Sequence, residues 1–127
     1  MKERYYKKLF LISALYDSIL GIIFTFFYKP VFSLLGVPLP SFSGYVSLIG
    51  VFLFVLGVGY YYIYKGDLAK NRDLIKVGIL YKLAYCSVAF FYLIVGTIPH
   101  PIFLAFGVAD LIFAILFIEC LKHIKKR

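Results

Sequence analysis

Four long apolar runs constrain this chain more than any other feature of its sequence. They cover residues 9–28, 46–64, 77–98 and 102–121. A helix of about 20 residues crosses the ~30 Å hydrocarbon core of a bilayer, so each run is long enough to span. Backbone groups in lipid must be satisfied within the segment, and unbroken apolar runs favour helices over barrel strands. We therefore predict an all-α fold, in which residues 1–127 form a single transmembrane domain built as an integral membrane four-helix bundle.

The composition agrees with a membrane protein. Of the 127 residues, 63% are hydrophobic and 16% are charged. A soluble domain is nearer 45–50% apolar and about 25% charged. The two cysteines, Cys86 and Cys120, both fall inside predicted spans and lack the spacing of a disulfide framework or a metal motif.

The distribution of basic residues predicts an orientation. Three segments that must lie on one side of the membrane carry four basic residues each: Lys2, Arg4, Lys7 and Lys8; Lys65, Lys70, Arg72 and Lys76; Lys122, Lys125, Lys126 and Arg127. The opposite side carries only Lys29. By the positive-inside rule, both the N- and C-termini are expected in the cytoplasm of a multi-pass protein of the cell's inner (plasma) membrane. The net charge of +8 is therefore a topology signal, and we predict the lipid bilayer, not nucleic acid, as the partner.

Three ionisable residues fall well inside the apolar runs: Asp17, Lys82 and Asp110. Each costs roughly 2.5–3.5 kcal/mol near the bilayer centre unless it finds a partner, water or a shallow depth. Tyr16 and Tyr85 lie beside Asp17 and Lys82 on the same helical segments. These five residues are the candidates for binding a ligand or carrying a proton.

Small residues recur at helical spacing on the same faces. They are Ser13, Gly21, Gly50, Gly57, Gly78, Gly107 and Ala114. Small residues at steps of three and four let helix backbones approach closely in lipid, so these positions predict the packed faces. The ionisable residues are then expected to point inward. For Lys82 two arrangements stay open: pairing with an internal carboxylate, Asp17 or Asp110, or snorkelling towards the cytoplasm.

The outer segment, residues 29–45, is expected as an apolar loop. Most of it, KPVFSLLGVPLPSFSG over residues 29–44, is too apolar for a solvated loop and too short to span the membrane. Two interpretations remain open: an interfacial turn lying on the headgroups, or a lid over the outer mouth of the bundle.

Several features resemble the DoxX-like group of small four-helix bacterial membrane proteins. They are the glycine-containing first helix, the outer segment LLGVPLP and the lysine-containing third helix GILYKLAY, which together cover nearly the whole chain. The resemblance implies a four-helix membrane fold and leaves open a role as an accessory or assembly subunit. The topology is also similar to that of EXPERA-domain proteins, which bind sterol-like molecules. The carboxylate of the first span resembles that of small multidrug resistance exporters.

The leading functional hypothesis is an intramembrane polar pocket that binds a small lipophilic or lipid-like molecule. Proton-coupled transport of a small solute and an accessory role in a membrane complex are the alternatives. The sequence contains no nucleotide-binding or hydrolase motif and no metal-ligand cluster, so we predict no cofactor, no metal and no catalytic residues, and favour a non-enzyme. A homo-oligomer stays open.

Overall fold

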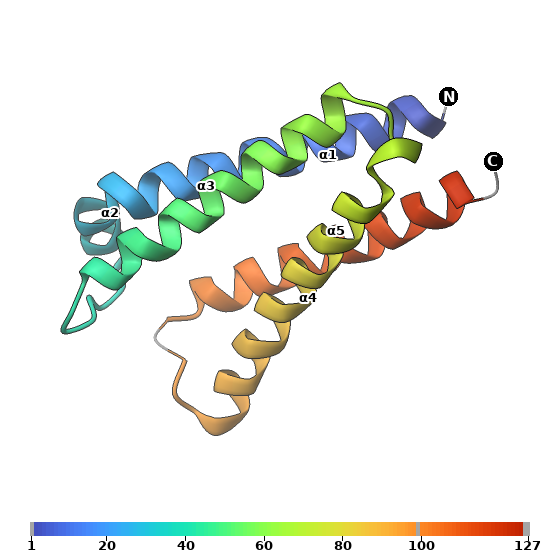
Figure 1. Ribbon diagram of the computed structural model, residues 1–127. Coiled ribbons are helices and arrows are strands. Elements are labelled where there is room, and N and C mark those ends of the chain that lie inside the picture. Colours follow the sequence, from blue (N-terminus) through green and yellow to red (C-terminus); the bar gives the residue numbers. More distant parts are fainter. Residues whose placement is uncertain (1, 99, 126–127) are drawn as a thin grey trace. The chain divides into compact units, whose positions relative to one another are not determined.

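The computed structural model describes residues 2–98 and 100–125, which form helices and no strand (Figure 1). The elements are α1 (Lys2–Phe26), α2 (Tyr28–Leu35), α3 (Gly44–Lys65), the 3-10 helix η1 (Ala69–Asn71), α4 (Arg72–Val95) and α5 (Ile102–Lys125). The chain divides after Lys65 into two units, one with α1, α2 and α3 and one with η1, α4 and α5. The predicted all-α class is confirmed. Lys126 and Arg127 of the basic tail lie outside the described residues.

Four helices are long and apolar enough to cross a membrane, as predicted. They correspond to Glu3–Phe26, Gly44–Lys65, Ala69–Val95 and Ile102–Ile124. Large aliphatic and aromatic side chains are exposed along all four, as expected for surfaces that face lipid. The helices also extend into the charged flanks, since α1 begins at Lys2 and α5 continues to Lys125. Helical hydrogen bonds are local and continue where side chains become charged, so hydropathy marks the apolar part of a helix and not its ends.

The first unit depends on a close approach between α1 and α3. A Cβ atom on Gly21 would lie 2.5 Å from the backbone nitrogen of Phe54, and one on Gly50 would lie 2.6 Å from that of Thr25. Side chains are not tolerated at such distances from a neighbouring backbone, so only glycine permits this packing. The Ser47 hydroxyl adds a hydrogen bond to the carbonyl oxygen of Thr25 at 2.9 Å. Direct backbone contact therefore joins the two helices.

The segment expected as an apolar loop contains the short helix α2. Its first turn accepts Pro30, because the first N–H groups of a helix have no intrahelical acceptor and proline lacks this donor. Gly36 ends the helix in the left-handed conformation with φ of 75°. The N–H of Val37 then donates to the carbonyl oxygen of Phe32 at 2.8 Å, as in a Schellman cap. Part of the outer segment is thus regular structure.

Aromatic contacts hold α2 within the first unit. The Phe32 ring is buried and meets the rings of Phe24 and Tyr28 at centroid distances of 5.6 Å and 6.1 Å. The Tyr28 hydroxyl donates to the Ser43 hydroxyl oxygen at 3.0 Å. These contacts join the end of α1, α2 and the residue before α3, so this part of the outer segment is anchored.

In the second unit, α4 packs along α5. Gly96 ends α4 in the left-handed conformation with φ of 78°. At the start of α5, the backbone N–H of Ile102 donates to Nδ1 of His100 at 3.1 Å. The imidazole therefore satisfies one of the N–H groups that the first turn of a helix leaves without a partner.

Alanine substitutions test the close approach of α1 and α3. Gly21→Ala and Gly50→Ala should each lower the free energy of unfolding by about 1–3 kcal/mol, because a methyl group would press on backbone atoms of the facing helix. Titration with a denaturing detergent, followed by circular dichroism, measures the change. Gly59→Ala is the matched control on α3, because no atom lies within 4 Å of its added Cβ. Equal effects at all three positions would contradict the described contact.

Candidate functional site

One face of α4 is buried, and Lys82 lies near its centre. The buried residues of α4 are Ile75, Gly78, Ile79, Lys82, Cys86 and Ala89. They recur every three or four residues, as positions on one side of a helix do. Lys82 is 0% exposed, so its side chain does not extend to the surface of the molecule. A lysine this deeply buried requires a polar partner within its own surroundings.

Asp110 of α5 is a partner of Lys82. The Lys82 Nζ donates to Oδ1 of Asp110 at 3.2 Å, and Asp110 is itself only 5% exposed. Attraction between opposite charges is strong at low dielectric, but the cost of removing both charges from water offsets much of it. The ion pair therefore allows these charges to be buried, while contributing less net stability than its geometry suggests.

Aromatic rings enclose the ammonium group. Its nitrogen lies 4.9 Å from the ring centroid of Phe113 and 5.6 Å from that of Tyr81, within the range of cation–π attraction. The Tyr85 hydroxyl, one turn along α4 from Lys82, donates to the carbonyl oxygen of Phe103 at 3.2 Å. The polar atoms between α4 and α5 thus form a small group inside an otherwise apolar contact.

The first unit contains a second buried acid. Asp17 of α1 is 1% exposed, and Ser13, one turn earlier, is also fully buried. The Ser13 hydroxyl has no hydrogen-bond partner among residues 2–98 and 100–125. Tyr16 is half-buried, with its hydroxyl oxygen enclosed. Sequence reasoning selects all of these residues, and the structure distributes them between two units, with Asp17 in one and the Lys82–Asp110 pair in the other.

The small residues selected by helical spacing are all buried. They are Ser13, Gly21, Gly50, Gly57, Gly78, Gly107 and Ala114. Their contacts differ in closeness. A Cβ atom on Gly107 would lie 3.4 Å from the Cβ of Ala89, which is ordinary van der Waals contact, whereas Gly21 and Gly50 face backbone atoms directly. The requirement for glycine is therefore strict at Gly21 and Gly50, between α1 and α3, and looser at Gly107 of α5.

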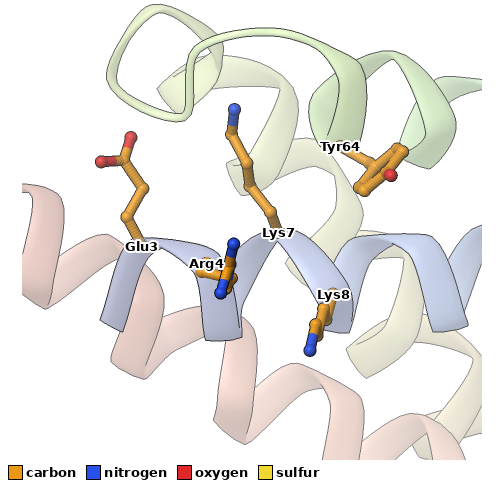
Figure 2. Close-up of a pocket in the computed structure, with 5 residues that line it drawn as sticks. All are labelled: Glu3, Arg4, Lys7, Lys8 and Tyr64. Atoms are coloured by element: carbon orange, nitrogen blue, oxygen red, sulfur yellow. The ribbon is translucent and has the colours of Figure 1, made fainter. Parts of the chain in front are cut away.

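Sequence reasoning missed a pocket at the start of α1. A cavity of about 480 Å³ is lined by Glu3, Arg4, Lys7 and Lys8 of α1 and by Tyr64 of α3 (Figure 2). The basic residues are interpreted above as topology signals only. A signal is nevertheless present in the sequence, since Arg4, Lys7 and Lys8 are separated by three and four residues and share one side of a helix.

Comparisons with known proteins assign no family. Among the residues that the structure describes, no group of three or more His, Cys, Asp or Glu side chains is arranged to hold a metal ion. No protein-family model, curated protein or solved structure matches the chain. The function must be inferred from the chain's own residues, and the DoxX-like resemblance stays a prediction.

Removing one member of the Lys82–Asp110 pair should be more harmful than removing both. Lys82→Met or Asp110→Leu alone leaves a buried charge without its partner and should cost roughly 3–5 kcal/mol of unfolding free energy. The charge-free variant, Lys82→Met with Asp110→Leu, should unfold within about 1 kcal/mol of the parent or be more stable. Chemical unfolding in lipid nanodiscs measures both. Additive losses in the double variant would show that the two side chains are not coupled.

Proposed function

We propose that this protein is a small four-span integral membrane protein that binds a lipophilic or lipid-like molecule carrying a polar group, through charged side chains buried at membrane depth. The observation that carries the proposal is the ion pair between Lys82 and Asp110, which is buried between two helices long and apolar enough to span. Ionisable residues within membrane segments are rare and costly, and most mark sites of binding or translocation.

The energetics of the pair support a role beyond packing. Hydrophobic residues of similar size usually pack at least as stably as a buried ion pair. Helices in lipid can also associate through small residues alone, as α1 and α3 do. If the pair served stability alone, apolar residues could therefore replace it without a loss of folding free energy. A polar group on an apolar ligand, by contrast, gains specificity from a fixed positive and negative charge.

The first unit contains buried polar groups of its own. The Ser13 hydroxyl is buried without a hydrogen-bond partner among the described residues, one turn from the buried Asp17. Buried hydroxyl groups almost always have a partner, so a site of this kind is consistent with a bound polar group. We include Asp17 among the residues whose substitution should be tested for ligand binding.

The proposal includes an orientation and a membrane. The three basic clusters on one side, against a single lysine on the other, support cytoplasmic N- and C-termini in the inner (plasma) membrane. A four-helix bundle of DoxX-like type is the arrangement that we propose for the spans.

Proton-coupled transport is the second candidate. It is favoured by the burial of Asp17 eight residues past the start of the apolar run of α1, about 12 Å below the membrane surface. A carboxylate at this depth can exchange a proton for a cationic solute. Under this function, Asp17→Asn would abolish proton-coupled uptake in proteoliposomes while leaving the fold unchanged.

Native mass spectrometry of the protein released from lipid nanodiscs tests the binding proposal. The parent protein should carry an additional mass, and the charge-free variant Lys82→Met/Asp110→Leu should lose it, because the polar group of the ligand has no charge to contact. The mass identifies the class of ligand. Asp17→Asn tests in the same way whether the acid of the first unit takes part.

The charge-free variant also provides the control for folding. Because it is expected to fold, loss of the ligand with unchanged circular dichroism would indicate a binding role and not a structural one. Retention of the ligand by a folded charge-free variant would contradict the proposal. A parent protein without additional mass, from membranes of its own host, would favour an accessory or structural role.

A further inference from the structure

We propose that the pocket at the start of α1 binds the phosphate group of an anionic glycerophospholipid. The pocket has a volume of about 480 Å³ and is lined by Glu3, Arg4, Lys7, Lys8 and Tyr64 (Figure 2). All five residues belong to the first unit, and none is part of the Lys82–Asp110 pair. The proposal is therefore independent of the function proposed above.

The lining has the chemistry of a phosphate site. Three side chains, Arg4, Lys7 and Lys8, are cationic, and one, Glu3, is a carboxylate, so the pocket is positive overall. A guanidinium group can form two parallel hydrogen bonds to phosphate oxygens, and an ammonium group adds a compact charge. Figure 2 shows Glu3 and Lys7 projecting from the same side of α1, with the Tyr64 side chain coming from α3. The Tyr64 hydroxyl can donate a further hydrogen bond.

The position of the pocket along the helices matches the depth of lipid headgroups. It lies where α1 passes from basic residues into the apolar run that starts at residue 9, and where α3 ends at Lys65. Tyrosines gather at the same ends, with the Tyr61 and Tyr64 rings 5.9 Å apart and Tyr5 half exposed. Tyrosine is enriched at the membrane–water interface, where its hydroxyl meets water and its ring meets lipid.

Exposed apolar residues continue from the pocket along the same face of α1. Leu15, Ile19 and Ile22 follow Arg4 and Lys8 at helical spacing, and all three apolar side chains are exposed. A lipid whose phosphate sits between the cationic side chains could lay its acyl chains along this stripe. Free phosphate would use only the polar end, so the arrangement favours a lipid. Basic groups beside a membrane span commonly recognise anionic headgroups.

Lipid adducts retained by the protein in native mass spectrometry test the proposal. After purification in detergent, the protein is incubated with phosphatidylglycerol, with phosphatidylcholine or with inorganic phosphate. The parent should retain phosphatidylglycerol in preference to phosphatidylcholine. Arg4→Gln and Lys7→Gln should each weaken this retention about fivefold, as expected for one cationic side chain near an anionic headgroup. Glu3→Gln should strengthen retention, because it removes the only negative charge of the lining.

Lys65→Gln is the matched control. Lys65 is exposed at the end of α3, beside Tyr64 in sequence, and does not line the pocket. It removes the same charge at the same end of the unit, so it should leave retention unchanged. Equal losses in Lys65→Gln and Lys7→Gln would reveal diffuse attraction and overturn the site. Retention of phosphatidylcholine as strong as that of phosphatidylglycerol, or binding of inorganic phosphate alone at comparable concentration, would overturn the assignment to an anionic lipid.

Discussion

The most demanding constraint in this protein is the burial of charge within an apolar environment. Lys82 and Asp110 are both almost completely buried, and they lie on helices whose exposed side chains are mostly apolar, as expected for contact with lipid. Each charge would be costly by itself, and the 3.2 Å contact between Nζ and Oδ1 makes their joint burial tolerable. The 3.2 Å contact also requires that the helix faces carrying Lys82 and Asp110 are turned towards each other. The functional proposal depends on this fixed arrangement of opposite charges.

The two units use different means to bring helices together. Between α1 and α3, glycine permits contact of the backbones themselves, with Gly21 and Gly50 facing backbone atoms of the other helix. Between α4 and α5, the contact at Gly107 is an ordinary van der Waals contact. The Lys82–Asp110 pair and the hydrogen bond of Tyr85 add polar contacts with defined geometry. Lipid provides little hydrophobic driving force between helices, so van der Waals packing and hydrogen bonding must supply the association in both cases. Close backbone packing therefore holds the first unit together, and specific polar contacts add to the packing of the second.

Hydropathy was sufficient to predict four long helices, because an apolar run of about 20 residues has few alternatives in a membrane. It does not predict α2, because the segment is too short to span a membrane and Pro30 reads as a helix breaker unless its place in the first turn is known. Helical spacing places Lys82 and Asp110 on faces rich in small residues, but it does not show which helix packs against each face, so only the structure identifies Asp110 as a partner of Lys82. The pocket beside Tyr64 is not predicted from the sequence, for a different reason. The basic residues before the first span have a sufficient explanation as topology signals, and only the continuation of α1 through them brings their side chains around one cavity.

Solid-state NMR in lipid bilayers offers the most direct test of the intramembrane ion pair. The measurement is the dipolar coupling between lysine Nζ labelled with nitrogen-15 and aspartate Cγ labelled with carbon-13. The account predicts a measurable coupling at Lys82 that is lost in Asp110→Asn, whose side-chain carbon is not labelled, because Nζ of Lys82 lies within hydrogen-bonding distance of the Asp110 carboxylate. The Lys76–Asp73 pair, 3.7 Å apart, gives a coupling that stays unchanged in this variant and serves as the internal reference. Couplings that are identical in the parent and in Asp110→Asn would show that the two groups are apart in the membrane. That result would contradict the ion pair and the binding function built on it.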